Sequence, residues 1–156
     1  MPKFSVTRSV PYSAEQVFAI AADVEHYKYF LPLVKRSIVR NVQELPGGGR
    51  TFEGQLTIAY KKLSIEEVMV SQVTVDPANQ TVTAESSQGP VKRLMAEWKI
   101  VATGDNSSDI NFSVDYELKS RTLQFVLSGM FDMAVRRVMT AFEERARDLY
   151  GAAATS

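Results

Sequence analysis

Few side chains in this sequence are suited to catalysis. Cysteine is absent and histidine occurs once, at His26, which excludes thiolate nucleophiles, disulfides and metal sites built from two histidines. His26 lies among Asp23, Glu25 and Lys28, a grouping typical of a solvated helix face. The sequence has no glycine motif for binding dinucleotides or phosphates and no paired-carboxylate motif. We therefore predict a protein that is not an enzyme and has no catalytic residues, no metal and no cofactor.

Glu67 is the carboxylate that the residue pattern directs most clearly toward the interior. Regular alternation puts it on the same face as three apolar residues, namely Leu63, Ile65 and Met69. There it could hydrogen-bond a ligand hydroxyl or act as a base. A bulge at the Glu66–Glu67 pair would instead leave both carboxylates in water. Regular alternation would also put the apolar residues Val68 and Val70 on the polar face of the strand, and we therefore favour the bulge.

The composition is typical of a globular domain. The 156 residues are 45% hydrophobic and 23% charged, with 18 basic and 18 acidic side chains. A net charge of zero gives no broad attraction to nucleic acid, so we expect no DNA partner. Because no apolar run is long enough to span a bilayer or resembles a signal segment, we expect a cytoplasmic protein. We predict a single domain over residues 1–151 and a C-terminal tail over residues 152–156.

Apolar periodicity divides the chain into strands and helices. Alternation over residues 3–10 predicts a strand, and Ser13 with Gln16 forms a capping-box pattern that begins a short helix. Asp23 is suited to cap a second short helix, which Pro32 ends. Six further strands with short turns are predicted between residues 37 and 118, followed by a long amphipathic helix over residues 120–150. The order predicts an α+β fold in which a curved antiparallel sheet wraps around the C-terminal helix.

Four segments carry a resemblance to a known family. They are YKYFLP at residues 27–32, SQVTVDP at 71–77, GPVKRLMAEW at 89–98 and VMTAFEERARDLYG at 138–151. In this order they resemble the START-like superfamily, also called the polyketide-cyclase or helix-grip fold. Within it, the chain is similar to coenzyme Q-binding proteins and to their bacterial relatives named ribosome-association toxins. The resemblance implies two short helices after the first strand and a hydrophobic cavity between the sheet and the long helix.

The resemblance also implies a ligand and a function. The ligand would be ubiquinone or a similar polyprenyl quinone, and the protein a non-catalytic carrier or chaperone supporting respiratory electron transport or quinone biosynthesis. A peripheral contact with the cytoplasmic face of the inner membrane or with respiratory complexes stays open. The predicted lining comes from the segment before the second strand, from the strands and from the long helix: Phe30, Leu31, Pro32, Leu56, Met69, Leu94, Trp98, Phe112, Leu127, Met130, Phe131 and Ala134.

Two alternative functions stay open. The toxin relatives imply a protein that binds a ribosomal subunit, for which short basic clusters occur at residues 34–36, 60–62 and 91–93. The cyclases of the superfamily imply a small polyketide cyclase or hydrolase, for which Glu67 is the only candidate acid or base that the sequence offers.

Several apolar residues have two interpretations. Trp98 could stack on a quinone head group or belong to the core. Gly129, in the long helix, could give room for a ligand, permit a bend or ease close packing. Five methionines could adapt to an irregular ligand or fill a core: Met69, Met95, Met130, Met133 and Met139.

The aromatic segment at residues 25–34 has two interpretations that do not exclude each other. Tyr27 and Tyr29 could meet a membrane interface, with nearby basic residues facing anionic head groups: Lys28, Lys35 and Arg36. In the second interpretation, the apolar side chains of the segment seal one end of the core: Phe30, Leu31 and Val34.

Overall fold

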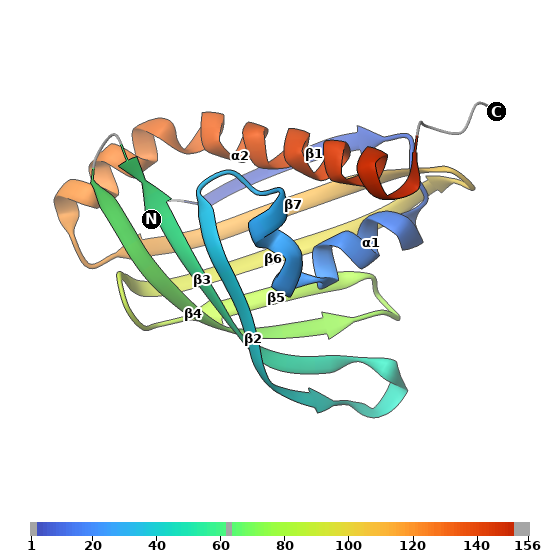
Figure 1. Cartoon of the computed structure of the whole chain (residues 1–156), viewed down its shortest axis with the longest axis horizontal. Coiled ribbons are helices and arrows are strands. Elements are labelled where there is room, and N and C mark those ends of the chain that lie inside the picture. Colours follow the sequence, from blue (N-terminus) through green and yellow to red (C-terminus); the bar gives the residue numbers. More distant parts are fainter. Residues whose placement is uncertain (1–2, 62–63, 152–156) are drawn as a thin grey trace.

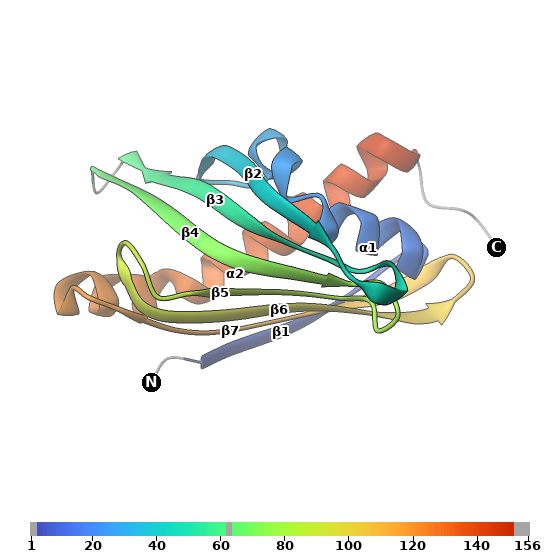
Figure 2. The same ribbon diagram turned by 90° about the horizontal axis from the view of Figure 1, so that it is seen from below.

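The computed structural model describes residues 3–61 and 64–151, which form an antiparallel sheet with helices along its concave side (Figure 1). The seven strands lie in the order β1-β7-β6-β5-β4-β3-β2. Their bounds are β1 Lys3–Val10, β2 Val34–Glu44, β3 Arg50–Tyr60, β4 Ile65–Asp76, β5 Thr81–Ser86, β6 Val91–Gly104 and β7 Ser107–Leu118. The helices are α1 Ala14–Ala22, the short 3-10 segments η1 Val24–Tyr29 and η2 Pro46–Gly48, and α2 Arg121–Tyr150. The sheet curves around α2 (Figure 2), which confirms the predicted α+β, START-like helix-grip fold.

The connection from β1 into α1 has the predicted geometry. The Ser13 hydroxyl accepts a hydrogen bond from the Gln16 amide at 3.2 Å, and the Gln16 side chain accepts one from the Ser13 amide at 3.1 Å. This capping box satisfies two backbone donors that the first turn of a helix leaves unpaired. Five of the nine residues of α1 are buried against the rest of the protein: Ala14, Val17, Ile20, Ala21 and Ala22.

The second short helix is a 3-10 segment that Asp23 does not cap as predicted. The Asp23 side chain makes no capping hydrogen bond to η1. Its carboxylate instead lies 2.8 Å from Nδ1 of His26, on an exposed surface. The helix ends at Tyr29, before Pro32, in keeping with the restriction that a proline places on the preceding residue.

The strands place their apolar side chains on the inner face of the sheet, toward α2. On β7, alternate residues are buried, namely Ser108, Ile110, Val114 and Tyr116. Their neighbours along the strand are polar and only partly buried. The alternation is therefore the one expected for a sheet with one dry face and one wet face.

The predicted bulge at Glu66 and Glu67 is wrong. β3 and β4 pair without a register shift from Arg50 opposite Val75 to Tyr60 opposite Ile65. Glu67 lies directly opposite Ile58 and so belongs to the inner face, whereas Glu66 belongs to the outer face. Both glutamates are nevertheless exposed, as the bulge was expected to leave them. Leu63, which the same pattern included, lies outside the described residues.

Helix α2 is anchored at its C-terminal end. Four residues on one stripe are buried: Val135, Met139, Phe142 and Ala146. The Tyr12 hydroxyl donates to the Gly151 carbonyl at 2.9 Å, and the Tyr150 hydroxyl donates to the Gln16 carbonyl at 3.2 Å. In residues 121–134, none of the side chains that the structure describes is buried. The two halves of α2 therefore differ in how closely they pack.

Candidate ligand-binding site

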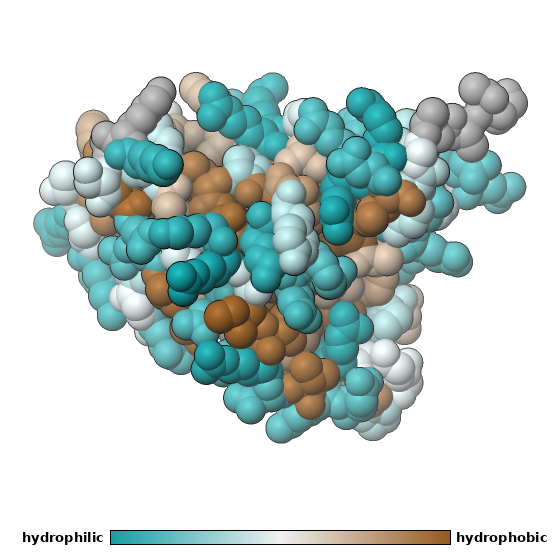
Figure 3. All heavy atoms as spheres, in the orientation of Figure 1, coloured by the Kyte–Doolittle hydropathy of each residue, from teal (hydrophilic) through white to brown (hydrophobic). Residues whose placement is uncertain are grey.

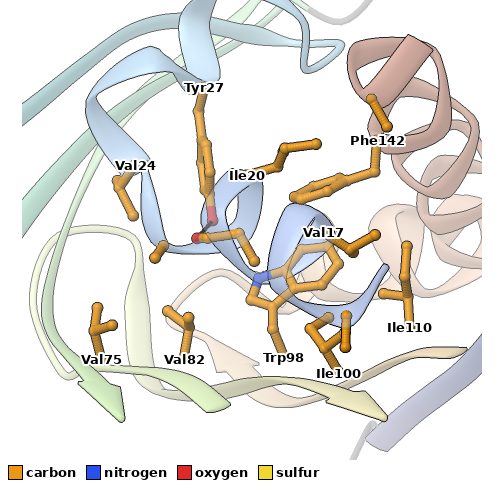
Figure 4. Packing of buried hydrophobic residues seen from close by; sticks show 14 of the residues in the cluster. Val17, Ile20, Val24, Tyr27, Val75, Val82, Trp98, Ile100, Ile110 and Phe142 are labelled. Atoms are coloured by element: carbon orange, nitrogen blue, oxygen red, sulfur yellow. Dashed lines mark hydrogen bonds between the residues drawn. The ribbon is translucent and has the colours of Figure 1, made fainter. Parts of the chain in front are cut away.

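The inner face of the sheet has a solid end. There α1, η1 and the C-terminal half of α2 pack on the strands around Trp98, which is 9% exposed. The rings of Phe112 and Phe142 each lie 4.4 Å from the indole ring, measured between centroids. Figure 4 shows Trp98 pointing from the sheet toward Phe142 of α2. The protein's own side chains therefore occupy this end, as one of the two interpretations of Trp98 expects.

The other end of the inner face, which we call the open end, is less well covered. Six apolar side chains define it, all on the inner face and all only partly buried: Leu56, Ile58, Ile65, Met69, Leu94 and Ala96. Only Leu56 among them packs against the core cluster. Figure 3 shows apolar side chains at the surface between α2 and the strands β3 and β4. A filled core would bury such residues fully. Because they remain partly exposed, the described side chains do not cover them fully.

The N-terminal half of α2 lies along the open end. Met130 and Ala134 are half-buried there, and Leu127 and Phe131 belong to the same helix, although their side chains lie outside the described part. Gly129 is exposed, and a Cβ atom added to it would meet no atom within 4 Å. Close packing is therefore not the reason for this glycine, which leaves the other two interpretations, a bend or room.

Tyr27 does not reach the surface, so its predicted place at a membrane interface is wrong. It is 5% exposed, and its hydroxyl donates to the Ala21 carbonyl. Its ring packs edge-on against Phe30 and Phe142, with centroid distances of 5.8 and 6.1 Å. Burial raises the pKa of the Tyr27 hydroxyl above its ordinary value, and the nearby Asp23 carboxylate adds to the shift.

The remainder of the aromatic segment divides between the core and the surface. Phe30, Leu31 and Val34 are partly buried and pack against the core cluster, as the interpretation that they seal one end of the core expects. Tyr29 is 64% exposed, as the other interpretation expects. Leu33, next to Pro32, is also exposed and has a left-handed backbone conformation with φ of 70°.

A surface groove of about 400 Å³ lies where this segment meets α2. It is lined on the segment side by Phe30 and Pro32, and on the helix side by Met133, Arg136, Arg137, Thr140, Ala141 and Glu144. Met133 is 58% exposed. Met133 lines this groove, and Tyr29 and Leu33 are exposed neighbours in sequence of its lining residues Phe30 and Pro32. We call these three exposed residues the apolar rim. Sequence reasoning missed the contribution of α2 to it, because the helix periodicity identifies an apolar stripe but not which part the sheet covers.

The methionines occupy different environments. Met139 is fully buried in the core, and Met133 lies at the apolar rim. Met69 and Met130 are half-buried at the open end. Met95 is exposed on the outer face, because its neighbours Leu94 and Ala96 face inward. Met95 therefore has neither of the two predicted roles, at a ligand or in the core.

The predicted lining residues fall into three groups. Those at the open end or beside it on α2 are Leu56, Met69, Leu94, Met130 and Ala134, with Leu127 and Phe131 on the same helix. Those in the solid end are Trp98 and Phe112. In the third group, Phe30 and Leu31 pack against the core, and Phe30 and Pro32 line the surface groove beside α2. Contact of these residues with a ligand stays a prediction.

The three basic clusters do not converge on one surface. Lys35 and Lys61 line a single shallow pocket beside the β3–β4 connection, where Lys35 donates to Glu66 at 2.9 Å. Lys62 lies outside the described residues. Arg93 is on the outer face, 3.0 Å from Asp115, and this contact lowers the pKa of the Asp115 carboxyl. Part of the basic surface is thus neutralised by neighbouring carboxylates.

Neither a metal centre nor a membrane span is apparent in the part of the chain that the structure describes. No three His, Cys, Asp or Glu side chains within it gather closely enough to hold a metal ion. None of its helices is both long and apolar enough to cross a membrane.

The chain is similar in sequence and in fold to known proteins. The family described as "Polyketide cyclase / dehydrase and lipid transport" matches residues 10–143. The ribosome association toxin RatA of Escherichia coli K12 is 29% identical over 154 residues, which covers 97% of this chain and 91% of that protein. The mitochondrial coenzyme Q-binding protein COQ10 homolog B of Xenopus laevis is 29% identical over 153 residues, covering 96% of this chain and 59% of that protein. A START superfamily protein from Mycobacterium smegmatis has the same fold, with a TM-score of 0.79 at 21% identity over 94% of this chain and 98% of that one.

Proposed function

Since the chain belongs to the polyketide cyclase/dehydrase and lipid transport family, we propose that it is a non-catalytic binding protein for a polyprenyl quinone such as ubiquinone. The isoprenoid tail would lie along the open end, between β3, β4, β6 and the N-terminal half of α2. The carrier would support respiratory electron transport or quinone biosynthesis. The name of the COQ10 relative, a coenzyme Q-binding protein, supports this choice of ligand.

The observation that carries the proposal is the incomplete burial of the open end. Apolar side chains that face the inside of a domain and yet meet solvent are stabilised when an apolar ligand covers them, at about 25 cal/mol per Å² of buried apolar area. The unbranched side chains of Met69 and Met130 are half-buried there and suit a flexible tail of irregular shape.

Organic extraction of the purified protein tests the proposal. Mass spectrometry and ultraviolet absorbance of the extract should detect a polyprenyl quinone at a substantial molar ratio to protein. If neither the extract nor protein reloaded with added ubiquinone contains bound quinone, the proposal is wrong.

The proposal extends to a contact with an anionic membrane at the apolar rim, through which the ligand would exchange. Tyr29, Leu33 and Met133 would insert between head groups, while Lys28 and Arg137 nearby would face anionic phosphates. Carboxylates also lie at this surface, and Asp132 pairs with Arg136 at 2.9 Å. We therefore assign most of the affinity to the apolar side chains.

Replacement of Met133 by serine is expected to weaken binding to phosphatidylcholine–phosphatidylglycerol vesicles by about ten- to a hundredfold, because insertion of a methionine side chain contributes roughly 1.5–3 kcal/mol. Vesicle flotation measures the effect. Met95→Ser is the matched control, since Met95 is also exposed (44%, against 58% for Met133) but lies on the outer face. Equal losses for the two variants, or no binding of the unmodified protein, would contradict the membrane contact.

A second candidate function is association with a ribosomal subunit. The name of the Escherichia coli relative, a ribosome association toxin, supports it, as does the presence of Lys35 and Lys61 around one pocket. Co-sedimentation with ribosomal subunits at moderate salt distinguishes the two candidates. Pelleting that is lost on reversing the charges of Lys35 and Lys61 would favour the ribosome, and absence of pelleting would exclude it.

A further inference from the structure

By strand pairing, four charged side chains of the described residues belong to the inner face: Arg8, Glu44, Arg50 and Glu67. Two of the four have protein partners. Arg8 donates to the Thr140 hydroxyl at 3.0 Å and lies 3.8 Å from the Glu143 carboxylate. Arg50 donates to the Ala22 carbonyl at 3.2 Å. Glu67, which lies at the open end, has no hydrogen-bond or ion-pair partner among the described residues.

Glu67 lies beside the residues of the open end. The uninterrupted pairing of β3 with β4 places it opposite Ile58 and between Ile65 and Met69 on the same face. Glu67 is near the β3–β4 connection, at the exposed margin of this apolar surface. A ligand whose tail covers Leu56, Met69 and Leu94 would therefore bring its polar head to Glu67.

The chemistry of a carboxylate distinguishes the two redox forms of such a head. A carboxylate only accepts hydrogen bonds. The carbonyl oxygens of an oxidised quinone also only accept, whereas each hydroxyl of the reduced quinol donates. Covering Glu67 with a quinone head would leave the carboxylate without a partner, which is costly for a charged group that loses contact with water.

We infer that Glu67 makes the open end selective for the reduced quinol, or for a prenylated phenol with the same hydroxyl, over the oxidised quinone. This inference rests on the proposed function and specifies the form of its ligand. The Glu67 carboxylate accepts a hydrogen bond from the ring hydroxyl at the margin, and the tail extends inward along the apolar strands.

Such selectivity has an electrochemical consequence. Preferential binding of the reduced form raises the reduction potential of the bound couple. For a two-electron couple, a tenfold difference between the dissociation constants of quinol and quinone corresponds to about 30 mV. The protein would thus hold its ligand in the reduced form.

Anaerobic calorimetry tests the inference with ubiquinone carrying a short prenyl tail and with its chemically reduced quinol. The unmodified protein should bind the quinol about tenfold more tightly than the quinone, as expected for one hydrogen bond to a charged acceptor. Glu67→Gln should remove this preference, since the amide can also donate to a quinone carbonyl. Glu66→Gln is the matched control, because Glu66 is the adjacent residue on the outer face and pairs with Lys35. It should retain the preference.

The outcomes separate the inference from the function on which it rests. Equal affinities for quinol and quinone in the unmodified protein, or an unchanged preference in Glu67→Gln, would overturn the role of Glu67 and leave quinone binding in place. Absence of binding to either form would overturn the proposed function itself.

Discussion

Replacement of Ala96 by phenylalanine is expected to abolish quinone binding and to leave the stability of the protein nearly unchanged. Ala96 lies on the inner face opposite Ala84 and Val114 and is only partly buried. A phenylalanine ring there would occupy the surface that the tail needs. Displacing roughly 150 Å² of apolar ligand contact costs about 3–4 kcal/mol, which raises the dissociation constant more than a hundredfold.

The same substitution distinguishes an open from a filled interior. In a filled core, the added ring would have to displace other side chains and would destabilise the protein by about 1–3 kcal/mol. Calorimetric titration gives the affinity and urea unfolding gives the stability. Glu97→Phe adds a ring at the neighbouring position on the outer face and should leave quinone affinity unaltered. Retained binding in Ala96→Phe would show that the ligand does not lie at the open end.

The second large effect is expected at Phe142, in the solid end. Its ring is 2% exposed and lies 4.4 Å from the ring of Trp98 and 5.3 Å from the ring of Phe30, measured between centroids. Phe142→Ala should lower the free energy of unfolding by about 3–5 kcal/mol, because it removes a large apolar side chain and leaves a cavity. The fluorescence of Trp98, the single tryptophan, follows the unfolding in urea.

Met130→Ala is the comparison for this prediction. Met130 lies on the same helix but is half-buried over the open end, so its truncation leaves little new cavity and should cost much less than the change at Phe142. If the two variants lose equal stability, the division of the inner face into a solid end and an open end is incorrect.

The architecture followed from the sequence because its signals are local. The alternation in β1 and the capping box of Ser13 and Gln16 each involve residues within a few positions of one another. Each signal also agrees with the superfamily resemblance. Where local propensity and overall fold agree, the elements and their order are predictable.

The errors occurred where the outcome depends on a neighbouring element. Val68 and Val70 suggested a bulge at Glu66 and Glu67, but the pairing of β4 with β3 keeps the register and places valines on the outer face. Tyr27 looked like a surface aromatic, and its burial depends on Phe142, a residue more than a hundred positions away. A single strand or segment contains no information about such partners.

The site was predictable only in part for the same reason. Inward-facing residues such as Leu56 and Met69 follow from strand alternation, whereas the exposure that remains to them depends on how α2 lies over the sheet. Met133 illustrates this point, since its exposure follows from packing at one end of the helix and not from the helix pattern.

The affinity for quinone should depend on the length of the isoprenoid tail. Calorimetry with ubiquinones that differ only in the number of isoprene units should show the dissociation constant falling with each added unit and then levelling once the open end is covered. The increments arise from burial of apolar area, at about 25 cal/mol per Å² before association costs. An affinity that is independent of tail length throughout the series would contradict a tail-binding surface between the sheet and α2.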